Sequence, residues 1–170
     1  MSLPFDEGVV PGPKVPGMRV YVASSFRNER CAGVVDALRA AGHLVYDFRD
    51  PLGNGETFSW REVDPGWEAW DVGEYRNALH SRPADAAFAL DMVALEKADA
   101  CVLVLPCGRS AYLEMGYAVG RCKRTVVLLG GEKLVPELMY RMIDARAETV
   151  EQVVEFLSGG VGDDARRLFR

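Results

Sequence analysis

Hydrophobic and polar positions near the start of this chain change from a strand-like to a helical period and back. The run Met18–Ser24 favours a strand and ends in small polar residues, which fits a strand followed by a loop. Val34, Leu38 and Ala41 then recur at helical spacing, and residues 43–47 predict a second strand. We therefore expect a βαβ unit here.

The second half of the chain continues this alternation. Ala100–Leu105 is an almost continuous apolar run, typical of a parallel strand buried on both faces, and Thr125–Leu129 predicts another central strand. Helices are predicted over 72–80, 85–97, 109–122, 134–143 and 150–157, and a short edge strand over 145–149. Strands alternating with helices predict a three-layer α/β fold, flavodoxin-like or Rossmann-like, with a parallel central sheet of about five strands. Ligands bind such sheets beyond the carboxyl ends of the strands.

The length of 170 residues fits a single domain. Residues 1–17 include four prolines and few core-forming side chains, so we expect a disordered leader there. The α/β domain is expected to span 18–157, and the polar stretch 158–170 is expected to be a frayed tail.

Residues 48–72 lack clean periodicity and interrupt the alternating pattern. The segment carries Phe58 and all three tryptophans, Trp60, Trp67 and Trp70. Long irregular segments inside compact domains are often lids or binding loops. Aromatic rings serve equally well to cover an edge of the core, so both interpretations stay open at this point.

Composition narrows the possible ligands and compartments. The formal net charge is −5 and no basic stripe is present, which argues against a nucleic-acid polymer as ligand. No apolar run reaches membrane-spanning length, and no signal peptide opens the chain. The four cysteines form no CxxC pair and only two histidines occur, so we expect no zinc site and reduced thiols in a cytoplasmic protein.

Two acidic residues lie in unusually apolar helical surroundings. Glu114 sits inside a run of apolar and small residues, with Ser110 and Tyr117 at helical spacing on the same face. Asp91 shares a predicted stripe with Phe88 and Leu95 and is also expected to face inward. One inward acid is commonly a structural hydrogen-bonding group, but two on helices that flank one central strand favour a cleft.

Paired carboxylates suit the transfer of a glycosyl group. One carboxylate attacks the anomeric carbon as positive charge develops there, and the other handles protons on the leaving group. The attacking carboxylate must be ionised, so it needs donors nearby, such as Ser110 or Tyr21.

Three loops are expected to meet at the carboxyl edge of the sheet. They are Ser24–Arg27, the segment that begins at Asp47, and Cys107–Ser110. The last of these opens a helix, and a helix N-terminus preceded by glycine can hold an anion. Together with the serines and arginine of the first loop, it suggests a phosphate as well as a sugar.

At these residues the chain resembles the nucleoside 2-deoxyribosyltransferase family and the related nucleoside-monophosphate N-glycosidases. Residues 19–26, RVYVASSF, resemble the opening strand and substrate loop of the family. Asp91, eight residues before Asp99, is similar to its base-contacting or proton-handling aspartate, and residues 98–104 resemble the strand that follows. Residues 110–118, SAYLEMGYA, resemble the helix that carries the family's nucleophile. The resemblance covers about residues 18–157.

The resemblance implies a set of roles. Glu114 would attack C1′ and release the base, Asp91 would contact the base or transfer a proton, and Tyr21 would orient Glu114. It implies no metal or organic cofactor, a nucleoside or nucleotide as small-molecule partner, and a homodimer or higher homo-oligomer. The residues expected to bind substrate are Ser24, Ser25, Phe26, Arg27, Asp47, Phe48, Trp60, Gly108, Arg109, Ser110 and Tyr117.

The chain also departs from the family pattern. Members that use free nucleosides often have an aspartate six residues before the glutamate, where this chain has Gly108, and its Trp60–Trp70 segment is long. Two alternatives stay open: a non-catalytic nucleotide-sensing module on the same fold, and a glycohydrolase of the NAD type. Neither GxxxxGK[ST] nor GxGxxG occurs in the expected context, which argues against a P-loop or a dinucleotide-binding Rossmann site.

Overall fold

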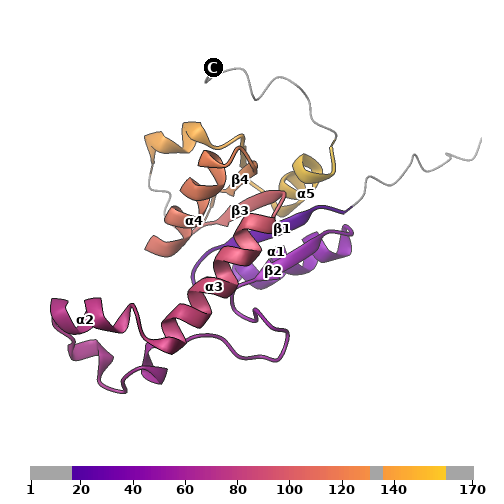
Figure 1. The fold of residues 1–170 in the computed structure, drawn as a ribbon. Coiled ribbons are helices and arrows are strands. Elements are labelled where there is room, and N and C mark those ends of the chain that lie inside the picture. The colour runs from indigo at the N-terminus through magenta and orange to yellow at the C-terminus, as the bar shows by residue number, and fades with distance from the viewer. Residues whose placement is uncertain (1–16, 131–135, 160–170) are drawn as a thin grey trace, which may run out of the picture.

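Five parallel strands form one sheet at the centre of the structure, a computed structural model that describes residues 17–130 and 136–159 (Figure 1). The strands are β1 (Arg19–Ala23), β2 (Leu44–Asp47), β3 (Ala100–Val104), β4 (Arg124–Leu128) and β5 (Ala145–Ala147). Their order, β2-β1-β3-β4-β5, is flavodoxin-like and confirms the expected α/β class. The predicted leader, apart from its last residue, and the predicted tail beyond Gly159 lie outside the described residues.

Five α-helices connect or follow the strands. They are α1 (Arg30–Ala40), α2 (Val72–Ala78), α3 (Arg82–Lys97), α4 (Arg109–Gly120) and α5 (Val150–Ser158), with short 3-10 helices at Trp60–Glu62, Trp67–Ala69 and Leu138–Met142. The prediction of an α-helix over 134–143 is wrong. The described part of that segment starts with extended backbone and continues as a five-residue 3-10 helix. Glu137 accepts a hydrogen bond from the backbone of Met139 and starts this short turn.

The helices cover both faces of the sheet, which gives three layers (Figure 1). Along β1, Val20 and Val22 enter the core beneath α1 and α5, while Tyr21 and Ala23 enter the core beneath α3 and α4. This alternation follows from the two-residue period of a strand. All five residues of β3 are buried, as expected for the central strand of a parallel sheet.

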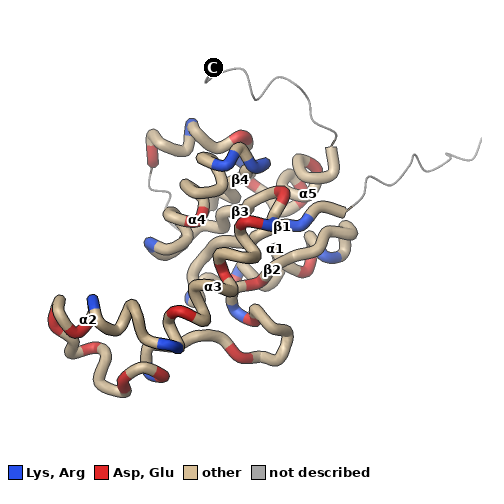
Figure 2. Tube along the Cα trace, viewed as in Figure 1, with Lys and Arg blue, Asp and Glu red and all other residues tan. Residues whose placement is uncertain are grey.

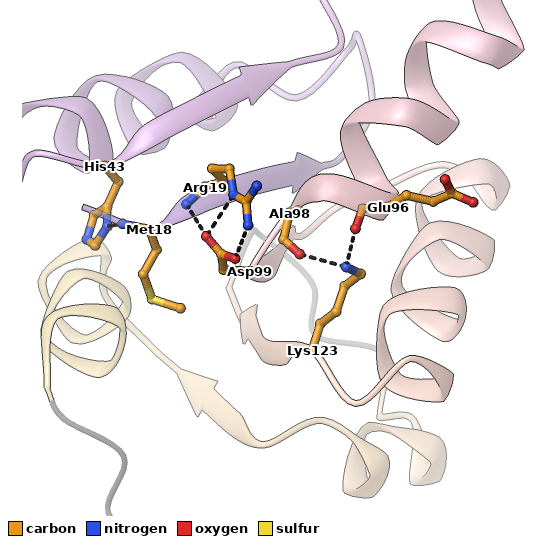
Figure 3. Close-up of polar contacts among 7 residues, drawn as sticks. All are labelled: Met18, Arg19, His43, Glu96, Ala98, Asp99 and Lys123. Carbon is orange, nitrogen blue, oxygen red and sulfur yellow. Dashed lines mark hydrogen bonds and ion pairs between the residues drawn. The ribbon is translucent and has the colours of Figure 1, made fainter. Parts of the chain in front are cut away.

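The amino-terminal edge of the sheet is closed by polar contacts (Figure 3). Asp99 pairs with the guanidinium of Arg19 at 2.6 Å and also accepts the Arg19 backbone N–H. Lys123 donates to the carbonyls of Glu96 and Ala98, at 2.8 and 2.6 Å, and so satisfies the carboxyl end of α3. With these groups paired to one another, the opposite, carboxyl edge is where ligand-binding loops are expected.

The irregular segment between β2 and α2 forms a cluster of its own. Trp60 packs edge-to-face against Phe58, Trp70 and Tyr75, with ring centroids 4.9, 5.6 and 6.0 Å apart. None of these rings belongs to either core cluster of the described residues, and the segment lies to one side of the sheet with α2 (Figure 1). These contacts do not favour the interpretation that the rings cover the core edge.

Acidic and basic positions are unevenly distributed along the chain, and the formal net charge is −5. Between Arg61 and Arg76 every charged residue is acidic, and red predominates along this segment and α2 in Figure 2. No described helix combines the length and the apolar character that crossing a membrane requires.

Asn28 ties the loops at the carboxyl edge of the sheet to one another. Its side-chain amide donates to the hydroxyl of Ser24 and to the carbonyls of Val104 and Pro106, at 3.0, 3.2 and 3.0 Å. The Arg30 guanidinium also donates to the carbonyls of Leu105 and Leu129, which directly follow β3 and β4. Because Asn28 is only 5% exposed, these bonds hold the loops after β1 and β3 in a fixed relation.

We expect Asn28→Ala to lower the free energy of unfolding by about 2 kcal/mol, because it removes the side-chain hydrogen bonds that join the loop after β1 to the loop after β3. Urea denaturation measures the change. Asn77→Ala, at an exposed position of α2, is the matched control and should change stability by about 0.5 kcal/mol or less. Equal effects of the two substitutions would contradict the role given to Asn28.

Candidate functional site

Glu114 lies at the margin of the buried stripe of α4. Ala111, Met115 and Ala118 are at most 3% exposed and pack against the sheet. The Glu114 carboxylate is drawn into the same space and is only partly exposed. Burial raises its pKa to about 7, the charge of Asp91 adds to the rise, and the hydroxyl of Tyr21 opposes it.

Asp91 lies on the carboxyl-terminal half of α3, where the helix packs on the sheet. Its Oδ1 accepts a hydrogen bond of 2.7 Å from the hydroxyl of Tyr46. Burial raises the pKa of Asp91, and the bond from Tyr46 partly offsets the rise. Leu95, on the predicted stripe, is buried, but Phe88 is 67% exposed. The expectation that Phe88 faces inward is therefore wrong, because the first half of α3 extends beyond the sheet (Figure 1).

A stacked pair of tyrosines lies on the sheet beneath the two acids. Tyr21 and Tyr46 are register partners in β1 and β2, and their ring centroids are 5.2 Å apart with planes inclined by 21°. Burial, Glu114 and Asp91 raise the pKa of Tyr21, so its phenol stays protonated. Its hydroxyl is buried and has no hydrogen-bond partner among the described residues, although it lies near enough to Glu114 to influence that acid.

The candidate site therefore joins side chains from four elements: β1, β2, α3 and α4. Neither carboxylate forms an ion pair within the described part of the chain. Two close carboxylates without a cation titrate as a coupled pair, and the first to ionise disfavours ionisation of the second. Near neutral pH, such a pair offers one charged nucleophile and one proton donor. Across residues 17–130 and 136–159, no group of His, Cys, Asp and Glu is placed to hold a metal ion.

The loop predicted to bind substrate after β1 has a fixed base and an exposed tip. The Ser24 hydroxyl donates to the carbonyl of Val104 at 2.8 Å, so it serves to join β1 to β3. The Ser25 hydroxyl accepts the backbone N–H of Arg27 and stabilises the turn. Phe26 is 61% exposed and meets Phe48 edge-to-face at 4.8 Å. The structure therefore brings together the loops after β1 and β2.

Several other predicted residues lie apart from the acids. Asp47 is buried and paired with Arg49 at 2.6 Å on the α1 face of the sheet, opposite to Tyr46. The Tyr117 hydroxyl donates to Glu96 at 3.4 Å. Trp60 lies in the aromatic cluster beside α2. Among the described residues, no hydrogen bond, ion pair or ring contact joins these three side chains to Glu114 or Asp91, so their role as ligand contacts stays a prediction.

The turn before α4 is open. Gly108 is the N-cap of the helix, and a side chain there would meet nothing within 4 Å. Arg109 and Ser110 are exposed on the first turn. The backbone N–H groups of this turn are therefore accessible, as an anion site at a helix N-terminus requires.

Sequence reasoning missed Tyr46, which bonds one of the two acids directly. The signal was present, because adjacent strand residues point to opposite faces of a sheet. The sequence predicts Asp47 as the site residue of β2. Asp47 lies on the α1 face of the sheet, however, and its neighbour Tyr46 faces the acids. A groove of about 490 Å³ begins beside Tyr46 and runs along β2 toward Lys97 and Arg19 at the amino end.

The fold and these side chains define a flavodoxin-like α/β protein with a partly buried carboxylate pair. Comparison with models of known protein families and with curated proteins finds no match. Among solved structures, the chain is similar to a 2-deoxyribosyltransferase from the psychrotolerant bacterium Bacillus psychrosaccharolyticus, described as a biocatalyst for nucleoside synthesis. The TM-score is 0.51 at 19% identity, over 79% of this chain and 89% of that one. This similarity shows the fold.

The raised pKa of Glu114 predicts a pH-dependent cost to stability. The folded state holds the proton up to about pH 7, whereas the ordinary pKa of a glutamate, as in the unfolded chain, is 4.5, so wild-type stability falls as pH rises through that window. Glu114→Gln lacks this titration. We expect its stability relative to wild type to increase by about 3 kcal/mol between pH 4 and pH 9.

Urea denaturation at a series of pH values measures this difference. The same comparison for Glu68→Gln, at an exposed position, provides the baseline. A Glu114→Gln difference that stays constant with pH would show that the carboxyl group ionises normally.

Proposed function

We propose that this protein is an N-glycosyl transferase or hydrolase of the nucleoside 2-deoxyribosyltransferase type, acting on a nucleoside or a nucleoside 5′-monophosphate. The observation that carries the proposal is the partly buried pair of Glu114 and Asp91 beside two protonated tyrosines. The fold shared with a 2-deoxyribosyltransferase supports it.

In the free protein, burial and the charge of Asp91 favour the protonated form of Glu114, so the proposed mechanism has this proton pass to Asp91 when the substrate binds. In the first step, the Glu114 carboxylate then attacks C1′ of the sugar and forms a C–O bond. The C1′–N bond breaks, and its electron pair goes to the base. Asp91 in its acid form donates a proton to the base, which leaves as a neutral molecule. The Tyr21 hydroxyl, close to Glu114, would orient the carboxylate.

In the second step, another base or water attacks C1′ and Asp91 recovers a proton from it. Glu114 leaves as a carboxylate, and two displacements retain the configuration at C1′. Transfer and hydrolysis therefore differ only in which acceptor reaches C1′, so Glu114, Asp91 and Tyr21 would serve both.

The phosphate of a 5′-monophosphate would bind at the open turn of Gly108, Arg109 and Ser110. The exposed N–H groups of α4 and the Arg109 side chain supply positive potential there. Arg27, exposed on the neighbouring loop, would add a second cation. The rings of Phe26 and Phe48 would lie beside the same phosphate-binding turn.

The proposed chemistry needs no metal and no organic cofactor, since both reacting groups are carboxyls. We place the enzyme in the cytoplasm. All four cysteines are free, and two are buried, in keeping with a reducing compartment.

The decisive experiment measures free-base release from a panel of nucleosides, 5′-monophosphates and NAD by wild type and Glu114→Ala. We expect release from at least one substrate, and a loss of about 10³-fold or more in kcat for the variant. Glu68→Ala, at an exposed position, should keep wild-type turnover.

Adenine added as acceptor separates transfer from hydrolysis through the appearance of an exchanged nucleoside. If wild type binds nucleotides by calorimetry yet releases no base from any of them, the protein is a sensing module and the proposed activity is wrong.

We also propose that the protein assembles with a second copy through α3 and α4. Large apolar side chains are exposed on both helices: Phe88 and Val93 on α3 and Leu113 on α4, at 67, 48 and 77%. Exposed apolar patches of this kind commonly mark interfaces. Sedimentation velocity should give twice the chain mass of 18.7 kDa.

Leu113→Glu should shift this assembly to monomer, whereas Leu52→Glu, in the loop after β2, should leave it unchanged. A wild-type monomer at micromolar concentration would contradict the proposed assembly without bearing on the chemistry.

A further inference from the structure

We infer that Tyr46 is a positioning residue that gives the two carboxyl oxygens of Asp91 different tasks, holding Oδ1 as an acceptor and leaving Oδ2 to exchange the proton with the substrate. The catalytic part of this inference rests on the proposed function. Its geometric part rests on the hydrogen bond between Tyr46 and Asp91.

The contact is short and is supported from the sheet. The Tyr46 hydroxyl donates to Oδ1 of Asp91 at 2.7 Å. The Tyr46 ring is stacked on Tyr21, and strand pairing sets the two residues side by side. Tyr21 is itself fully buried, so the phenol that holds Asp91 has little freedom to move.

A carboxylic acid carries its proton on one oxygen at a time. An O–H group that donates to Oδ1 occupies that oxygen as an acceptor, so the proton of the acid form resides on Oδ2. The phenol stays protonated because burial and Asp91 raise the pKa of Tyr46. Tyr46 thus sets which oxygen of Asp91 reaches the leaving base.

No other group competes for this role among the described residues. Tyr46 is the one side chain that hydrogen-bonds Asp91 there. The remaining titratable groups that interact with the acids are Tyr21 on β1, Cys101 on β3, Cys107 before α4 and Glu114 on α4, and none is a cation. Loss of the phenol would leave Asp91 without a fixed orientation.

Tyr46→Phe tests the inference, because it keeps the ring and its stacking while removing the donor. We expect kcat for base release to fall about tenfold with KM within twofold, since the bond acts on proton transfer rather than on binding. The alkaline limb of the pH profile, set by loss of the Asp91 proton, should move up by about one pH unit.

A purely structural tyrosine would change stability without shifting this limb. Tyr140→Phe is the matched control: it removes a hydroxyl from a second stacked pair, with Tyr112, whose hydroxyl group lies 3.1 Å from its own. That variant should keep the wild-type pH profile.

Carbon-13 NMR of labelled Asp and Glu carboxyl groups provides a readout that needs no turnover. The Asp91 midpoint should rise in Tyr46→Phe and stay in place in Tyr140→Phe. An unchanged Asp91 midpoint, or an unchanged alkaline limb in an active enzyme, would overturn the inference. A raised midpoint in a protein that releases no base would overturn the proposed function and leave the hold of Tyr46 on Asp91 intact.

Discussion

Two carboxyl groups that share a poorly solvated space cannot both be ionised at low cost, and the site depends on this constraint. Between α3 and α4, Glu114 and Asp91 face each other's charge without an ion-pair partner in the described chain. In a purely structural setting, apolar residues of the same size would be more favourable there. The unfavourable arrangement is what keeps a proton available near neutral pH, and the surrounding sheet must be stable enough to tolerate it.

The strand order explains how residues distant in sequence reach this space. Because β1 lies between β2 and β3, the chain crosses from one side of β1 to the other, and sheets of this kind bind ligands outside the carboxyl ends of the strands at such a reversal. The acids, however, lie over the middle of the strands, beside Tyr21 and Tyr46, and not at the outer loops. The chemistry thus rests on regular elements, while the exposed loops around it are free to determine which ligand is held.

The sequence predicts the five strands and the α-helices, apart from the helix expected over 134–143, and it predicts that Glu114 and Asp91 turn inward, because these features depend on local periodicity. Buried runs such as residues 100–105 and the apolar surroundings of Glu114 are readable without tertiary contacts. The pairing of Asp91 with Tyr46 depends on the packing of α3 across β2, which no local pattern encodes. Ser24 was expected to meet a ligand, but its hydroxyl joins two strands, since small polar residues serve both purposes.

The position of β2 at the border of the sheet has a consequence for the chemistry. A border strand has a neighbour on one side only, so its other row of backbone groups remains available for pairing. Leu44, 69% exposed, lies two residues before Tyr46 on that strand. Any molecule that lined up against β2 would press on the same short strand that restrains Asp91. Events at the molecular surface would thereby reach Asp91, the proposed proton donor, through two residues of backbone.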